Sequence, residues 1–185
     1  KQSLFIGIIL MSIGIVSCNT NTELSTGYYE VQVKEALTEG AEDSISVGVS
    51  LEYPVSGVSK QVLNRITSHI LGKGTNSEET DIQKAVEEYI STTVTNYKET
   101  NLPIYEEVQQ MGSRLSGMTW EDMLNGFFSG YYNNMVSYTL SAFSYTGGAH
   151  GNSGVYCVNF NLKDGSIVQE SDLFKEGYEE TLSKS

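Results

Sequence analysis

The chain has 185 residues, of which 39% are hydrophobic and 18% are charged, so it can form one ordinary domain with a core of its own. The 11 Lys and Arg residues against 23 Asp and Glu residues give a formal net charge of -12. This charge repels nucleic acid at long range and favours a basic partner. We therefore expect no nucleic-acid binding.

The first segment is typical of a secretion signal. After Lys1, an apolar run from Leu4 to Val16 has the length of a signal-peptide core and is too short for a comfortable membrane span. It ends in "IVSC", which resembles the lipobox of bacterial lipoproteins, whose cysteine is acylated and becomes the new N-terminus. We expect residues 1–17 to be a lipoprotein signal peptide, lacking its initiating methionine here, and Cys18 to be the lipidation site. The alternative is a cysteine that happens to follow a transmembrane anchor.

Residues 18–26 are polar and predict a tether that lets the folded part stand off the lipid surface. Asn19 follows the cysteine, and no acidic run does. By resemblance to the sorting signals of Gram-negative lipoproteins, this predicts the periplasmic face of the outer membrane. The membrane, reached through the lipid anchor, is thus one expected partner.

The other cysteine, Cys157, lies in "VYCVNFNL". With Cys18 acylated, no partner remains in this chain for a disulfide, so Cys157 is either a buried free thiol or a reactive one. We expect burial, because free cysteine is among the most buried residue types.

Two strands are predicted next. The segment "GYYEVQVKEALTEG" alternates apolar with polar residues, which is typical of a half-buried strand. In "DSISVGVSLEYP" four aliphatic residues share one face: Ile45, Val47, Val49 and Leu51. Pro54 is expected to end this strand.

The apolar period then changes to that of a helix. Val62, Ile66 and Ile70 lie four residues apart in "VSKQVLNRITSHILGKG", and Gly72 is expected to stop this helix. A second helix is predicted from about Glu79 to Thr100, with an apolar stripe that suits packing against a sheet. The following "LPIYEEVQQMGSRLSG" is ambiguous between a short helix and a covering loop.

Strands return in "MTWEDMLNGFFSGYY", "NNMVSYTLSAFSYTGG" and "GVYCVNFNLKDGSIV". The turn dipeptides Asn133-Asn134 and Asp164-Gly165 predict a meander of antiparallel strands. The order of elements predicts an α+β fold, an antiparallel sheet with two or more helices packed on one face. The final "SDLFKEGYEETLSKS" begins a helix without apolar partners, so we expect the last domain to continue beyond Ser185.

The glycine-rich "YTGGAHG" is the candidate binding loop, with Tyr145, Gly147, Gly148 and His150 as its site residues. Both glycines can take positive φ without a Cβ penalty, so the loop could simply connect two strands, pinned by hydrogen bonds of His150. Tyr145 and His150 could also contact a ligand. Both interpretations can hold together.

No catalytic constellation is recognisable. The two histidines are His69 and His150, and a lone histidine cannot make a hydrolytic zinc site, which takes three protein ligands. His69 lies on the first predicted helix, where a half-buried or solvent-facing structural histidine is expected. We name no catalytic residue, no metal ligand and no cofactor.

Three segments, "SISVGVSLEYP", "VLNRITSHIL" and "NNMVSYTLSAFSYTGGAHGNSGVYCVNFNLKDGSIVQESDLF", resemble in order and spacing a PdaC-type domain followed by an RsiV-type C-terminal domain. The resemblance implies a PdaC-type α+β domain at 27–151 and the start of an RsiV-type domain, truncated here, at 152–185. RsiV-type domains include the lysozyme-sensing part of an anti-sigma factor. PdaC-type domains precede the catalytic module of a peptidoglycan deacetylase, whose metal-binding Asp and two His have no counterpart here.

Two functions are therefore expected. The first is a non-enzymatic cell-envelope lipoprotein that binds a protein, such as a basic lysozyme-like one, or a cell-wall glycan of peptidoglycan type. The alternative is an accessory or N-terminal part of a deacetylase-like, peptidoglycan-modifying enzyme whose catalytic groups lie beyond Ser185.

Overall fold

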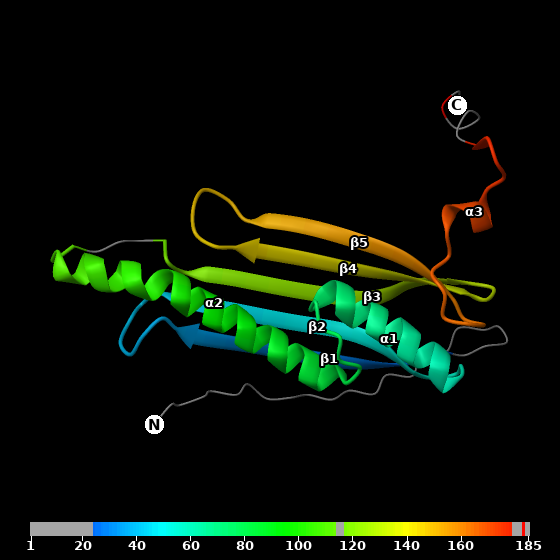
Figure 1. Cartoon of the computed structure of the whole chain (residues 1–185), viewed down its shortest axis with the longest axis horizontal. Helices are drawn as coiled ribbons and strands as arrows, with labels where there is room; N and C mark the ends of the chain where they lie inside the picture. Colours follow the sequence, from blue (N-terminus) through cyan, green and yellow to red (C-terminus); the bar gives the residue numbers. More distant parts are fainter. Residues whose placement is uncertain (1–23, 114–116, 179–182, 184–185) are drawn as a thin grey trace.

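The computed structural model describes residues 24–113, 117–178 and 183 (Figure 1). The expected signal peptide, the lipidation site Cys18 and residues 19–23 of the expected tether lie outside the described residues. The elements in chain order are β1 (Ser25–Ala36), β2 (Ser44–Ser56), α1 (Lys60–Gly74), α2 (Ile82–Gln110), β3 (Trp120–Tyr132), β4 (Met135–Tyr145), β5 (Asn152–Asn161) and α3 (Glu170–Leu173).

The five strands form one sheet in the order β1-β2-β3-β4-β5. The predicted α+β fold is confirmed, and β3, β4 and β5 form the predicted antiparallel meander. One pair differs from the expectation, because β2 and β3 run parallel. The two helices between them carry the chain back along the sheet, so that both strands start from the same end, as a helical crossover requires.

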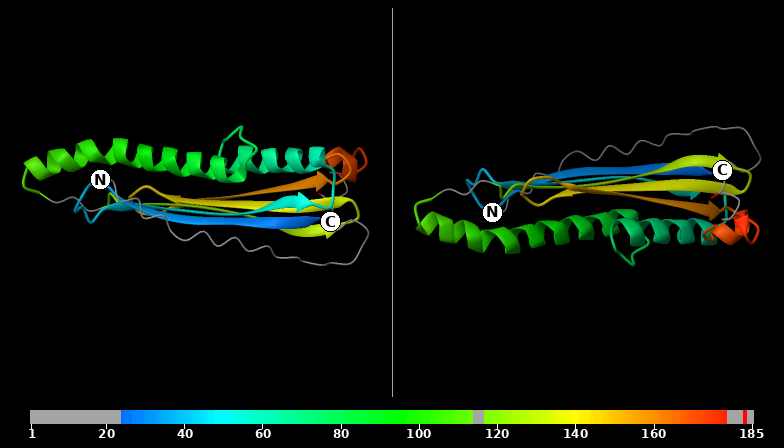
Figure 2. Two further views of the ribbon diagram at one scale, coloured as in Figure 1. Left: turned by 90° about the horizontal axis from the view of Figure 1, so that it is seen from below. Right: turned by 90° about the horizontal axis from the view of Figure 1, so that it is seen from above.

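Both long helices lie on one face of the sheet (Figure 2). Their apolar stripes meet the alternate residues of the strands in a core that includes the fully buried Leu51, Ile66, Val86 and Phe160. No helix or strand among the described residues covers the opposite face, which we call the open face. The fold is therefore two-layered, with one layer of helices on one layer of sheet.

Helix α1 begins where the sequence predicts it and ends slightly later. The side chain of Ser59 accepts a hydrogen bond from the backbone N–H of Val62 (3.3 Å) and caps the first turn. The helix runs to Gly74 rather than stopping at Gly72. A Cβ added at Gly74 would lie 3.2 Å from Leu124, so a small residue lets the end of α1 approach the sheet closely.

Helix α2 is longer than predicted. It starts at Ile82, capped by Asp81, and continues to Gln110, so the ambiguous segment after Thr100 is neither a loop nor a separate helix. Pro103 lies inside it, although proline removes one helical hydrogen bond. The extension is held by a second core cluster, in which Leu102 and Tyr105 pack against buried residues of the β1–β2 end.

Two strand boundaries also differ from the expectation. Strand β2 continues through Pro54 to Ser56, and its pairing with β3 ends at Leu51, so the proline lies beyond the part of β2 that is paired on both sides. Strand β1 begins at Ser25, and Leu24 is already buried. The folded domain therefore starts inside the segment expected to be tether.

Strand β5 completes the sheet rather than opening a new unit. It pairs with β4 over its whole length, from Asn152 to Asn161, so the expected domain start at residue 152 falls inside the β4–β5 hairpin. The predicted turns are present, with Asn133 at φ 53° and Gly165 at φ 74°. The last described helix, α3, has four residues.

Candidate functional site

The predicted loop joins β4 to β5. Gly147 and Gly148 have φ values of 86° and 105°, which confirms the predicted positive φ. The hydroxyl of Tyr145 donates to the carbonyl oxygen of Gly148 (2.9 Å) and holds the turn. A Cβ at Gly147 would lie 2.3 Å from the carbonyl oxygen of Gly117, so this glycine is required by both conformation and space.

His150 does not pin the loop to another element. Its side chain is exposed, and its Nδ1 lies 3.2 Å from the carbonyl oxygen of the adjacent Gly151. Tyr145 thus provides the hydrogen bond that was expected from His150. The histidine remains a projecting side chain at the tip of the hairpin.

The loop is continuous with the open face of the sheet. Phe143 and Tyr145 occupy alternate positions of β4, and the strand register places both opposite the helices. The ring of Phe143 lies against the loop, because a Cβ at Gly151 would come within 2.4 Å of it. The candidate loop and the open face therefore form one surface.

The open face is rich in hydroxyl and amide side chains. By register it presents mostly small polar residues on four neighbouring strands: Ser46, Ser50, Asn125, Ser137, Thr139, Ser141, Ser153 and Asn159. Among them stand Phe127 and Phe143, which are 46% and 37% exposed. Aromatic rings and hydroxyl groups are thus interleaved on a broad, flat surface.

Several of these side chains hold one another across strands. Ser137 donates to the side-chain oxygen of Asn159 (2.6 Å), and Thr139 donates to Ser129 (3.1 Å). Such cross-strand bonds fix the rotamers and leave further donor and acceptor positions facing outward. The surface is therefore ordered before any ligand arrives.

Cys157 belongs to this surface, so its predicted burial is wrong. The thiol is free and exposed, with its sulfur 3.9 Å from the Thr139 hydroxyl oxygen. The alternation of β5 explains the error, because Val158 and Phe160 point into the core and Cys157 must then face the opposite side.

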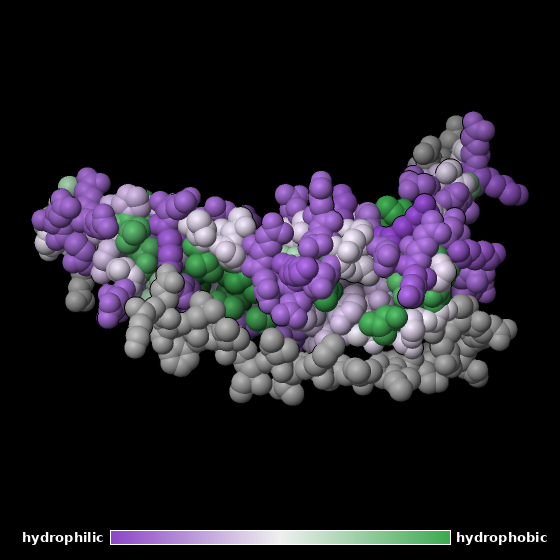
Figure 3. Space-filling model, turned by 60° about the horizontal axis from the view of Figure 1, so that its bottom comes forward, coloured by the Kyte–Doolittle hydropathy of each residue, from purple (hydrophilic) through white to green (hydrophobic). Residues whose placement is uncertain are grey.

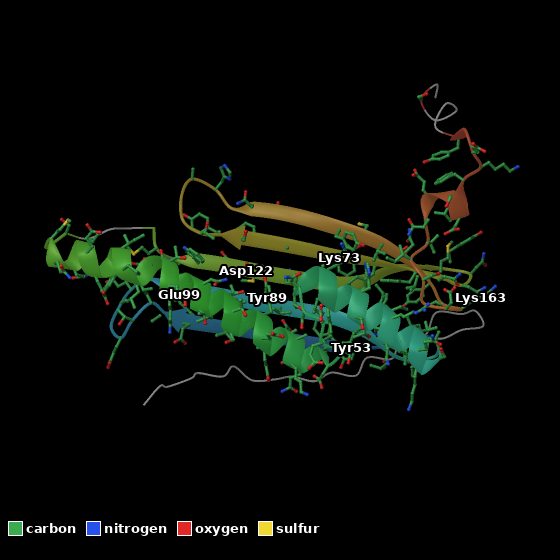
Figure 4. All side chains as sticks on the ribbon, viewed as in Figure 1. Tyr53, Lys73, Tyr89, Glu99, Asp122 and Lys163 are labelled. Atoms are coloured by element: carbon green, nitrogen blue, oxygen red, sulfur yellow. The ribbon has the colours of Figure 1, made fainter. Side chains whose placement is uncertain are left out.

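His69 is a structural residue, as predicted. It is half-buried on α1, its Nε2 lies 2.9 Å from the Tyr156 hydroxyl, and its ring packs edge-on against Phe160. Burial lowers the pKa of His69, and the nearby Lys73 ammonium lowers it further. Lys73, at the end of α1 (Figure 4), also lies 5.4 Å from the centre of the Tyr156 ring.

A half-buried polar pair that the sequence did not reveal joins the two layers. The hydroxyl of Tyr89 on α2 donates to the carboxylate of Asp122 on β3 (Figure 4). Burial raises the pKa of Asp122, and the bond from Tyr89 opposes this rise. Burial is also the main cause that raises the pKa of Tyr89, and the hydrogen bond to Asp122 raises this pKa further. The pair fixes the position of α2 on the sheet.

The described residues offer no enclosed catalytic centre. They contain no group of three His, Cys, Asp or Glu side chains that could hold a metal ion. A pocket beside Asp43, Tyr105 and Met118 measures about 140 Å³, which is below the size of ordinary ligand cavities. Two shallow hollows that open widely to solvent, one beside Arg65 and His69 on α1 and one beside Glu79 and Glu88, measure about 670 and 600 Å³. No described helix is long and apolar enough to cross a membrane. The open face combines exposed aromatic rings with polar side chains on four strands, and it is the surface that we examine as the candidate site.

Comparison with known proteins places the fold. No protein-family model and no curated protein matches the chain. A crystal structure of a DUF3298 family member from Bacteroides fragilis shares 21% identity and superposes over 89% of this chain with a TM-score of 0.77. The fold is that of DUF3298 proteins. A DUF3298 family protein from Pseudomonas aeruginosa agrees, with 17% identity, 87% coverage and a TM-score of 0.56.

The chain spans 67% of the first neighbour and 62% of the second. DUF3298 is the type of domain found in PdaC-like and RsiV-like proteins, so the predicted resemblance is confirmed at the level of the fold. The specific order, a PdaC-type domain followed by an RsiV-type domain, stays a prediction.

Proposed function

We propose that this chain is a cell-envelope lipoprotein, acylated at Cys18, whose folded part is a non-enzymatic binding module for cell-wall glycan. The open face carries the proposal. A sugar ring presents hydroxyl groups at its edge and C–H groups on its faces, so it can hydrogen-bond to serine and asparagine side chains while stacking on an aromatic ring. Phe127 and Phe143, set among these polar residues, match that chemistry.

The flatness of the surface suits a polymer. An extended glycan needs a long, shallow platform rather than a deep cavity, and β3, β4 and β5 provide rows of side chains at regular spacing. Peptidoglycan is the glycan available to a protein on the periplasmic face of the outer membrane, which is the location we propose.

The test is co-sedimentation of a form that begins at Asn19 with purified peptidoglycan. Phe127→Ala and Phe143→Ala should each reduce the bound fraction several-fold, since each removes a stacking surface. Ile104→Ala is the matched control for loss of an exposed apolar side chain, because Ile104 is 45% exposed but lies on α2, on the other side of the sheet. Equal binding by all variants would exclude the open face as the glycan site.

A basic protein of lysozyme type is a second candidate, and a different observation favours it. Acidic residues gather at the end of the molecule that holds the β1–β2 turn and the end of α2: Glu39, Glu42, Asp43, Glu106 and Glu107. Binding there would weaken as salt rises. Titration of a c-type lysozyme at low and moderate salt tests it, and Glu106→Lys with Glu107→Lys should abolish binding.

A further inference from the structure

The folded part of the chain begins at one end of the sheet. Strand β1 starts there, opposite the last residue of β2, and the parallel strand β3 ends there as well. The same end holds the start of α1 and the turns that follow β3 and β5 (Figure 1). We call it the near end and define it by residues 55–65, 131–135 and 162–167.

The near end cannot lie far from an anchor at Cys18. Six residues lie between Cys18 and Ser25, and the seven fully extended steps from one Cα atom to the other span at most about 25 Å. An acylated Cys18 would therefore keep the near end close to the lipid headgroups, whereas the far end lies a sheet length away (Figure 1).

The side chains of the near end suit a lipid interface. Tyr132 is 70% exposed and Tyr131 is 50% exposed at the β3–β4 turn, and Val55 projects nearby at the end of β2. Tyrosine favours the membrane–water boundary because its ring is apolar and its hydroxyl group is polar.

Charge is distributed unevenly along the molecule. The segments of the near end carry Lys60, Arg65 and Lys163 against Asp164, and the adjoining residues 168–178, which lie at the same end (Figure 1), add Lys175 against Glu170, Asp172 and Glu176, so that charges of both signs balance there. The described residues of the far end, in the ranges 37–43, 104–113, 117–121 and 145–151, include six acidic residues: Glu39, Glu42, Asp43, Glu106, Glu107 and Glu121; Arg114 lies between two of these ranges in the sequence. Hydrophilic residues cover the tip where α2 ends (Figure 3).

This asymmetry determines how the domain stands on an anionic surface. The net charge of -12 repels such a surface at long range, but screening limits this repulsion to about 8 Å at physiological ionic strength. Within that distance the acidic far end is repelled, whereas the near end has no net charge and its exposed lysines, Lys60 and Lys163, can each contact an anionic headgroup.

We propose that the near end is a membrane-contacting surface, which docks on anionic phospholipid headgroups through Tyr131, Tyr132, Lys60 and Lys163. The contact holds the long axis of the domain away from the bilayer, so that the far end points toward the cell wall and the open face, which runs along this axis (Figures 1 and 2), stays clear of the lipid. The inference rests on the proposed anchor at Cys18.

The test uses the full acylated chain reconstituted into phosphatidylcholine vesicles, with and without phosphatidylglycerol. Cys157→Ser removes the native exposed thiol, and a fluorophore is attached through either Asn134→Cys at the near end or Glu39→Cys at the far end. A quencher on the lipid headgroups reports proximity. We expect quenching to be several-fold stronger at position 134 than at position 39, and to increase with phosphatidylglycerol.

Two sets of variants identify the contacts. Tyr132→Ser should reduce near-end quenching in both lipids, whereas Lys60→Glu with Lys163→Glu should remove the increase caused by phosphatidylglycerol. Val155→Ser and Lys34→Glu, matched changes of exposed residues outside the near end, should alter neither value. Circular dichroism confirms that each variant is folded.

A failure of the docking surface and a failure of the proposed anchor give different results in this experiment. Anchored protein that is quenched equally at positions 134 and 39 would overturn the docking surface and leave the anchor intact. Protein that does not float with the vesicles, or that floats equally well with Cys18→Ala, would overturn the proposed anchor and this inference with it.

Discussion

The hydroxyl of Tyr138 on β4 reaches across β3 and donates to the carbonyl oxygen of Glu52 on β2 (3.0 Å). The Glu52 carboxylate in turn accepts from the backbone N–H of Phe128 on β3 (2.8 Å). These two bonds tie three strands together just beyond the last β2–β3 pair, Leu51 and Gly126, where the ladder between β2 and β3 ends. Side-chain groups thus replace the missing backbone partners.

Gly126 makes this arrangement possible. A Cβ at this position would lie 2.2 Å from the Tyr138 hydroxyl oxygen, so Gly126→Ala should displace the ring and break its bond to Glu52. We expect a loss of about 1 to 3 kcal/mol in the free energy of unfolding, measured by urea denaturation. Gly154→Ala is the matched control, since nothing lies within 4 Å of its added Cβ. Equal stability of the two variants would contradict the account.

The Tyr89–Asp122 pair should respond to pH with a defined sign. Burial holds the pKa of Asp122 above its ordinary value, so the folded state retains the proton more tightly than the unfolded state. The resulting stability is present below the unfolded pKa and is lost as pH rises through the folded pKa. Asp122→Asn, which has no charge to bury, should therefore gain stability relative to the wild type between about pH 3 and 7.

Tyr89→Phe should act in the opposite direction. It removes the hydrogen bond that opposes the rise in the pKa of Asp122, so that pKa should rise further. At neutral pH the half-buried carboxylate of Asp122 then lacks its hydrogen-bond donor, which should lower the free energy of unfolding by about 1 to 3 kcal/mol. Chemical denaturation of both single variants and of the double variant measures the coupling. Additive effects would show that the two side chains do not interact.

His69 should titrate below its ordinary value of 6.5, because burial and Lys73 both disfavour the imidazolium. Its contribution to stability is fully present above the unfolded pKa and is lost as pH falls through the folded pKa. An NMR titration measures this, with the His69 signal assigned by its persistence in His150→Ala. Lys73→Met should raise the pKa of His69 only partway, since burial remains. A pKa of His69 at or above 6.5 in the wild type would contradict the half-buried position of its ring beside Lys73.

The two loop glycines should differ in their tolerance of substitution. Both have positive φ, but a Cβ at Gly147 meets the Gly117 carbonyl oxygen, whereas a Cβ at Gly148 meets nothing within 4 Å. Gly147→Ala should thus lower the melting temperature more than Gly148→Ala, whose strain costs about 1 kcal/mol. His150→Ala should change stability by less than about 0.5 kcal/mol. The reverse order for the glycines would contradict the loop geometry.

The strands could be predicted from the sequence because apolar residues at every second position, such as Ile45, Val47 and Val49, must all face the same core. The length of α2 was not readable, because Pro103 suggests a boundary that tertiary packing of Leu102 and Tyr105 overrides. The parallel β2–β3 pair was missed because local patterns do not report which strands become neighbours.

The candidate loop was found from its glycines, but the open face around it was not. Its signal was present in the polar positions of the predicted strands, such as Asn125, Ser141 and Asn159, which alternate with core residues. These positions gain meaning only once the register brings them side by side. The Tyr89–Asp122 bond had no sequence signal, because its partners are 33 residues apart in the chain.

An NMR titration of the form beginning at Asn19 with soluble peptidoglycan fragments tests most directly whether the open face binds cell-wall glycan. We expect the amide signals of the residues around Asn125, Ser141 and Phe143 to shift together with those of the loop, while the signals of α1 and α2 stay in place. Shifts confined to the helices, or no shifts at all, would contradict it.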